Sequence, residues 1–181
     1  MNMNVTTYTA LDSTENYLRL YVNEALFLDY CRQCPNFGCR WSCPPFDFNV
    51  EDFWRRFTWI RLIFQKIDLP SLAGKTDAES AAQAAQIRRR VKDDLLCRLF
   101  ALERAYPGSY ALSAGACSLC RTCGRTDGAA CRRPAEMRHS IEALGGDVGK
   151  TAGQYFGLEL LWSKDGSVPA YSVIAGALLI R

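Results

Sequence analysis

Histidine is almost absent from this chain, with one among 181 residues, and the common catalytic motifs are missing. A single histidine gives little support for a Cys–His nucleophile. The sequence contains no Walker-type phosphate loop, no HExxH motif and no CxxxCxxC run of the radical enzymes. Acidic side chains are present, but no pattern pairs them for acid–base catalysis. These absences leave the question of enzyme activity open and direct attention to other residue types.

Strong charge and long apolar runs are also missing. The formal net charge of +3 is too small to indicate a nucleic acid or an acidic partner. The longest apolar run, residues 173–180, is far too short to span a bilayer. The first residues do not combine a basic segment with an apolar run, as a signal peptide does. We therefore expect a cytoplasmic protein without nucleic acid or membrane partners.

Cysteine is abundant instead, with nine residues. An odd number argues against a framework of paired disulfides, and clustered cysteines of a reducing compartment are more often metal ligands or catalytic groups. All but Cys97 fall into two loops. The first cysteine loop, residues 31–45, contains Cys31, Cys34, Cys39 and Cys43, and the second cysteine loop, residues 115–134, contains Cys117, Cys120, Cys123 and Cys131. Cys97 lies apart from both loops and is not expected to be a ligand.

The second cysteine loop has the more diagnostic spacing. Three thiolates at C-x2-C-x2-C intervals can reach three corners of a cubane from one tight loop, and Cys131 can close the fourth. Bacterial ferredoxins use nearly this run, with a proline directly after the last cysteine. Here Pro134 follows Cys131 by three residues. The spacing predicts a [4Fe-4S] cluster at this loop.

The first cysteine loop has a less diagnostic spacing, C-x2-C-x4-C-x3-C. Its prolines, among them Pro44 and Pro45, exclude regular structure, so something else must hold its shape. The thiols could hold iron or zinc, or could be buried in a loop that its aromatic residues pack. Whether the two loops share one cluster or hold two is open.

Zinc is the main alternative to iron and sulfide. Structural zinc sites usually pair two C-x2-C knuckles around one tetrahedron, which the three-thiol run of the second loop does not resemble. Disulfide exchange through a C-x2-C pair would not need four thiols per loop. Arginines flank both loops, in agreement with a negatively charged cluster, at positions 32, 40, 121, 125, 132 and 133.

The remaining chain predicts one α+β domain over residues 1–181, with one mixed or antiparallel sheet, flanking helices and the two metal-binding loops. Strands are expected at residues 17–22, 59–67, 110–114 and 170–180. Helices are expected at residues 24–28, 50–57, 76–106, 134–144 and 148–156. The strand at 59–67 should be buried on both faces. The residues before position 14 should be poorly ordered or form an edge segment.

Two motifs in the cysteine loops resemble the DUF2284 family of predicted metal-binding proteins. They are CxxCPNFGxxWSCPPF at residues 31–46 and GACSLCxxCxxxxGxxCRxP at residues 115–134, followed by RHSIEALGGDV at residues 138–148. The resemblance implies metal binding, as iron–sulfur, with no established reaction. It carries ligand roles onto Cys31, Cys34, Cys43, Cys117, Cys120, Cys123 and Cys131. Cys39 occupies a position that is often not cysteine, and His139 replaces a usual proline and is expected on the surface at a helix start.

The sequence thus favours an iron–sulfur protein that passes electrons to a redox partner protein, or that assists a redox or methyl-transfer enzyme. A zinc-stabilised interaction module without redox activity is the alternative. A third hypothesis is an enzyme whose substrate binds at an open corner of a cluster. The oligomeric state is open.

Overall fold

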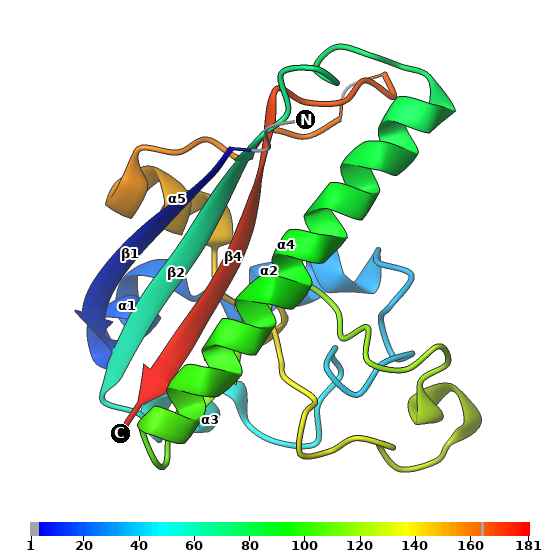
Figure 1. Ribbon diagram of the computed structural model, residues 1–181. Helices are drawn as coiled ribbons and strands as arrows, with labels where there is room; N and C mark the ends of the chain where they lie inside the picture. The colour runs from blue at the N-terminus through cyan, green and yellow to red at the C-terminus, as the bar shows by residue number, and fades with distance from the viewer. Residues whose placement is uncertain (1–3, 164) are drawn as a thin grey trace.

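A four-stranded antiparallel sheet forms the centre of the computed structural model, which describes residues 4–163 and 165–181. The strands have the spatial order β1-β2-β4-β3 (Figure 1). Their bounds are Val5–Ser13 for β1, Trp59–Asp68 for β2, Tyr110–Leu112 for β3 and Tyr171–Ile180 for β4. Each neighbouring pair is antiparallel, so the predicted α+β class with one sheet is confirmed.

Strand β2 lies between β1 and β4 and is apolar on both faces. Ile60, Leu62 and Phe64 are fully buried in the cluster on one face. Ile63 and Ile67 are buried on the other face, because successive side chains of a strand point to opposite sides. The predicted two-faced strand is therefore confirmed.

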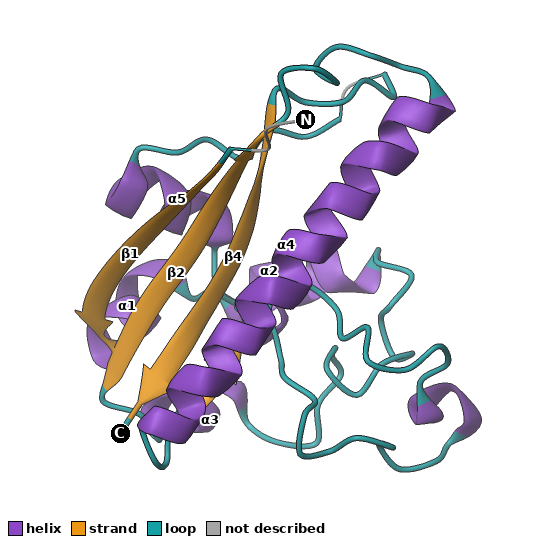
Figure 2. Cartoon of the chain, viewed as in Figure 1, coloured by secondary structure: helices purple, strands orange, loops and turns teal. Residues whose placement is uncertain are grey.

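Helix α4 (Ala78–Ala105) covers one face of the sheet and runs along its length (Figure 2). Val91, Leu95 and Leu99 are buried at steps of four residues, as the sequence predicts. The helix begins one residue later than the predicted capping box, because Asp77 Oδ1 accepts the backbone N–H of Ser80 (2.8 Å).

The opposite face is covered by α1 (Thr14–Tyr21), α3 (Val50–Arg55) and α5 (Val148–Phe156), as Figure 1 shows. Trp54 of α3 is fully buried there, and its indole Nε1 donates to the carbonyl of Leu144 (2.9 Å). The hydroxyls of Tyr17 and Thr151 lie 2.9 Å apart and join α1 to α5. Trp54 and Tyr17 are the two largest fully buried side chains among the described residues.

The strand expected at residues 17–22 is wrong, because this segment belongs to α1. Ser13 caps the helix by accepting the N–H of Asn16, and Tyr17 turns inward while Tyr21 stacks on it at 5.2 Å. Aromatic residues at a spacing of four fit a helix once one face is buried, which outweighs their strand propensity. The preceding residues form the edge strand β1.

The helix expected at residues 134–144 is also wrong. Only Glu142–Leu144 forms a short 3-10 helix, η2, and a second one, η1, lies at Gly124–Asp127. The backbone before η2 bonds elsewhere, since the N–H of Ser113 donates to the carbonyl of His139 (2.8 Å). The helices predicted at residues 24–28, 50–57 and 148–156 are confirmed as α2 (Glu24–Arg32), α3 and α5, and the strands predicted at 110–114 and 170–180 as β3 and β4.

None of the described helices combines the length and the apolar character that a bilayer-spanning helix requires.

Candidate metal centre

The two cysteine loops lie side by side and are joined by hydrogen bonds between side chains and backbone. The backbone N–H of Cys117 donates to Ser42 Oγ, and Arg40 Nη1 donates to the carbonyl of Cys117, both at 3.0 Å. The indole of Trp41 donates to the carbonyl of Ala129 (3.0 Å). Figure 1 shows the two loops, pale blue and yellow-green, interleaved at one side of the sheet. The fold thus brings both predicted cysteine loops to one end of the molecule.

Arg125 of the second loop fastens the first loop. Its guanidinium Nη1 donates to the carbonyls of Arg40 (3.0 Å) and Cys43 (2.6 Å), and Nη2 donates to that of Pro45. The guanidinium also lies 5.2 Å from the ring centre of Trp41. One side chain therefore donates to three carbonyls of the first loop, of which that of Arg40 also accepts the backbone N–H of Cys43 (3.0 Å).

The thiols of the second loop form one set. Cys117, Cys120, Cys123 and Cys131 are all half-buried and line one small cavity of about 20 Å³. Burial raises the pKa of Cys117, and the neighbouring thiols of Cys131 and Cys120 act in the same direction. The positive charge of Lys92 opposes this effect. All four cysteines that the spacing singled out thus face a common space.

The first loop gathers three of its four thiols. Burial raises the pKa of Cys31, and the thiols of Cys43 and Cys34 raise it further. Cys43 is buried and Cys34 is exposed, with Asn36 Nδ2 donating to Cys34 Sγ at 3.7 Å. Cys39 is exposed, and its thiol is not one of the main causes of the raised pKa of Cys31 or of Cys43.

The thiols of the two loops line different cavities. Cys31 and Cys34 line a different cavity, of about 1060 Å³, from that of the second set. Among the described residues, no three cysteine, histidine, aspartate or glutamate side chains are close enough together to surround a single metal ion. The structure thus places the cysteines of the two loops around different cavities.

Helix α2 positions the first set, since Cys31 lies in its last turn. Asn23 caps this helix by accepting the N–H of Leu26, and its own N–H donates to the carbonyl of Gly145 (2.8 Å). Gly145 has a φ of +79°, and a Cβ there would lie 2.8 Å from the Cα of Glu24. A glycine is therefore required for α2 to approach η2 this closely.

The predicted surface position of His139 is wrong. This residue is 5% exposed, its ring lies edge-on to Phe46 (4.8 Å) and Phe48 (5.6 Å), and its Nδ1 donates to the carbonyl of Ser42 (3.2 Å). Burial lowers the pKa of His139, and the hydrogen bond to Ser42 partly offsets this. No helix starts at Pro134, so the expected reason for an exposed His139 side chain is missing. Phe46 and Phe48, close together in the sequence after Pro45, were the sequence feature that could have indicated aromatic packing around His139.

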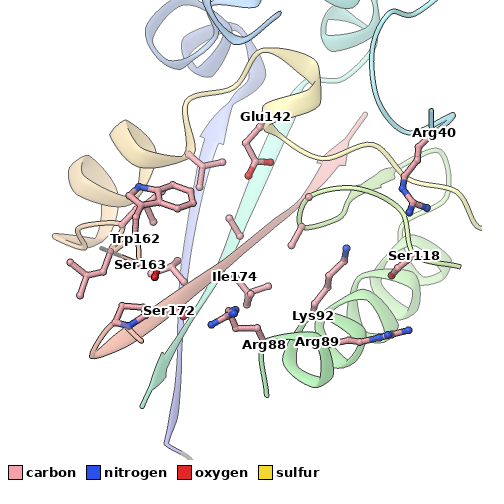
Figure 3. A pocket seen from close by; sticks show the side chains of 18 of the residues that line it. Arg40, Arg88, Arg89, Lys92, Ser118, Glu142, Trp162, Ser163, Ser172 and Ile174 are labelled. Carbon is pink, nitrogen blue, oxygen red and sulfur yellow. The ribbon is translucent and has the colours of Figure 1, made fainter. Parts of the chain in front are cut away.

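The sequence did not single out Lys92 or Glu142, which lie beside the thiol sets. Lys92 Nζ donates to the carbonyl of Ala116 (2.6 Å), directly before Cys117, and burial lowers the pKa of Lys92. Glu142 Oε2 is buried without a hydrogen-bond partner among the described residues, and burial raises the pKa of Glu142. Both line a cavity of about 1070 Å³ (Figure 3). Lys92 follows a run of arginines and Glu142 lies in the RHSIEALGGDV motif, and neither local pattern indicates that the two side chains line one cavity.

The comparison with protein families agrees with the cysteine motifs. Residues 19–179 match the sequence model of the family described as predicted metal-binding protein (DUF2284). No curated protein and no solved structure matches the chain. Since the match includes both cysteine loops and all strands except β1 and the last residue of β4, the chain belongs to the DUF2284 family of predicted metal-binding proteins.

Proposed function

We propose that this protein holds two iron–sulfur clusters and passes electrons between a redox partner protein and a second acceptor. The second set would supply four thiolates, from Cys117, Cys120, Cys123 and Cys131, and the first set three, from Cys31, Cys34 and Cys43. The observation that carries the proposal is that the four thiols of the second loop line one cavity. A bound cubane supplies one-electron transfer without any further catalytic group.

The C-x2-C-x2-C spacing of the second loop favours a cluster over zinc. Structural zinc sites usually pair two C-x2-C knuckles around one tetrahedral ion, which this three-thiol run does not resemble. A cubane binds each thiolate at a different iron, so its ligands are spread more widely around a larger centre. Two separate thiol sets fit two such centres.

The surrounding side chains suit negatively charged centres. Burial raises the pKa of Cys43 and of Cys117, and nearby cations oppose this rise, Arg40 and Arg125 at Cys43 and Lys92 at Cys117. Ser42 Oγ lies 3.7 Å from Cys43 Sγ, within hydrogen-bonding reach of the sulfur. Positive charge and donors near the sulfurs stabilise thiolates and tune the potential of a bound centre.

Exposure favours the first set as the point of exchange with a partner protein. Cys34 is exposed and Cys31 is half-buried, whereas every thiol of the second set is half-buried. An electron that enters at the first set would have the second set as its nearest neighbour across the interleaved loops. In this role the protein would serve a redox enzyme, or a methyl-transfer enzyme that needs reduction, as an accessory.

A second candidate function is favoured by the missing fourth thiol of the first set. Cys39 is exposed outside the group, and Cys31 and Cys34 line a cavity of about 1060 Å³. A centre with three thiolates has one corner without a protein ligand, where a small molecule in the cavity could bind. The protein would then be an enzyme as well as an electron carrier.

Metal analysis of protein purified without oxygen tests the proposal. We expect about eight iron and about eight acid-labile sulfide per chain, or about four of each if the loops share one cubane. Cys120→Ser and Cys34→Ser should each remove about half of the iron from a protein with two centres. Cys97→Ser is the matched control, because Cys97 is exposed and lies on α4 away from both sets.

The same preparations separate the alternatives. Cys39→Ser should keep all the iron, and loss of iron from this variant would show that Cys39 completes the first set. Zinc without iron or sulfide in the folded wild-type protein would contradict the proposal and support a zinc-stabilised interaction module. In that case, a chelator should unfold the loops.

A further inference from the structure

The largest cavity beside the second set has walls from several parts of the fold. Helix α4 contributes Lys92, strand β4 contributes Ile174, and the second cysteine loop contributes Ser118 and Cys120. The segment after α5 contributes Trp162. The cavity has a volume of about 1070 Å³ (Figure 3), enough for a small organic molecule.

The lining is strongly basic. Five basic side chains border the cavity, namely Arg40, Arg88, Arg89, Lys92 and Arg121, against one acidic side chain, Glu142. Within the described residues, Arg88, Arg89 and Arg121 have no carboxylate partner. Figure 3 shows Arg88 and Lys92 on the same wall of the cavity, with Arg88 directed toward Ile174 and Lys92 toward Glu142, whereas Arg89 turns away. An anion in this cavity would lie near the positive charges that α4 supplies.

Glu142 supplies the second, independent observation. Its Oε2 is buried without a hydrogen-bond partner among the described residues, and the side chain points into the cavity from the end opposite Arg88 (Figure 3). A buried carboxyl oxygen without a partner is unfavourable, so a ligand that forms a hydrogen bond with it would gain binding free energy. Burial also raises the pKa of Glu142, which favours the neutral acid as a donor.

The rest of the wall is suited to an organic group. Val148, Leu160 and Ile174 give it an apolar surface, and Trp162 at the rim is 75% exposed. An exposed tryptophan next to a cavity offers a face on which a planar group can stack. Inorganic phosphate alone would leave these contacts unused.

We propose that this cavity binds a small organic anion whose carboxylate or phosphate group is held by Arg88 and Lys92 and whose other end reaches Glu142. The ligand would lie beside Cys120 of the second set. This goes beyond the proposed function, since an electron carrier needs no cavity for a small molecule. It does not depend on which metal the cysteines hold.

Calorimetric titration of the protein as purified without oxygen tests the inference with four probes: benzoate, phenyl phosphate, inorganic phosphate and neutral benzamide. Benzoate or phenyl phosphate should bind, and the comparison between them identifies the acidic group. Inorganic phosphate should bind more weakly than the better aromatic anion, and benzamide should not bind. Binding should weaken with added salt, because charges attract the ligand.

Arg88→Gln provides the decisive variant, with Arg90→Gln as its matched control. Arg90 is exposed on the same helix and does not line the cavity. Loss of a charge-assisted hydrogen bond should weaken binding by roughly tenfold or more in Arg88→Gln. Arg90→Gln should bind as the wild type does.

Three results would overturn the inference: neither aromatic anion binds at millimolar concentration, benzamide binds as well as benzoate, or both variants bind equally. Iron and sulfide are measured on the same samples. Intact iron without anion binding would reject this inference alone, and anion binding without iron would reject the iron–sulfur proposal alone.

Discussion

The sheet region and the cysteine-loop region of this protein are held together by different forces. In the sheet region, β2 pairs along its length with β1 and β4, and buried apolar side chains fill the space between sheet and helices. In the cysteine-loop region, individual side chains donate hydrogen bonds to backbone carbonyls, among them those of Arg125, Arg40 and Trp41. Strand pairing and helices satisfy the backbone in the first region, whereas short turns together with individual side chains do so in the second.

This difference predicts an unequal dependence between the regions. Burial of a large apolar side chain stabilises by several kcal/mol, whereas one hydrogen bond contributes about 1 kcal/mol net. The cysteine loops rest on the sheet region through α2, β3 and η2, so they should fail when the sheet fails. The stability of the sheet should depend little on the loops, so the sheet should stay folded when the loops open.

Trp54→Ala should have the largest effect. Trp54 is fully buried and its indole is the donor to the Leu144 carbonyl, so truncation leaves a cavity and a carbonyl without its partner. We expect a loss of about 3–5 kcal/mol in the free energy of unfolding, measured by denaturant titration. Both regions should lose protection from hydrogen exchange together, because the carbonyl of Gly145, directly after η2, accepts the N–H of Asn23 at the start of α2.

Trp59→Ala is the control for this substitution. Trp59 is 45% exposed at the start of β2, so its truncation should cost much less. If Trp54→Ala left the amides of the cysteine loops protected while the sheet unfolded, the dependence of the loops on the sheet would be contradicted.

Arg125→Gln should have an intermediate effect that is confined to the loops. The substitution removes donors from the carbonyls of Cys43 and Pro45 and the stacking on Trp41, at a cost of about 2–3 kcal/mol. Hydrogen exchange of residues 36–45 should accelerate by more than tenfold, and that of β2 should not change. Lost protection in β2 would show that the loops support the sheet.

Arg133→Gln is the matched control in the same loop. Among the residues that the structure describes, Arg133 forms an ion pair only with Glu136, and both side chains are nearly half exposed. Exposed pairs of this kind contribute about 0–1 kcal/mol, so exchange in the first loop should remain as in the wild type.

The same division decides what the sequence could predict. The alternation of β2, the four-residue steps of Val91, Leu95 and Leu99, and the caps Asn23 and Asp147 are local signals, and each predicted its element. The spacing of the second loop predicted that its four cysteines gather, and they do line one cavity. Patterns within one short segment of the chain therefore predicted most of the sheet region and the cysteines of the second loop.

Contacts between distant segments explain what could not be predicted. Tyr17 favours a strand by propensity, but Trp54 and Thr151 bury it on a helix face. Residues 134–141 have helix signals, but the carbonyl of His139 accepts a hydrogen bond from the N–H of Ser113 instead of one within a helix. No local pattern states which distant partner will be present.

The single histidine gives the smallest prediction and connects the two regions. His139 Nδ1 donates to Ser42 beside Cys43, while its ring packs against Phe53 of α3 at 5.9 Å. Burial lowers the pKa of His139 in the native state, with Arg138 acting in the same direction and the Ser42 hydrogen bond opposing it. The unfolded chain binds a proton below about pH 6.5, where the native ring does not yet do so. Stability should therefore fall as the pH drops from about 6.5 to the native pKa, with a slope of at most about 1.4 kcal/mol per pH unit.

His139→Gln should remove this slope, because glutamine can still donate to Ser42 but does not titrate. The measurement is the free energy of unfolding of both proteins from pH 7 to pH 5 (~two units). Glu142 also titrates abnormally, but its raised pKa gives stability the opposite pH dependence and is present in both proteins. The difference between the two curves therefore isolates the histidine. Parallel curves would mean that His139 is as accessible to protons in the native state as in the unfolded chain, and that the aromatic packing around His139 does not seal the boundary between the sheet and the cysteine loops.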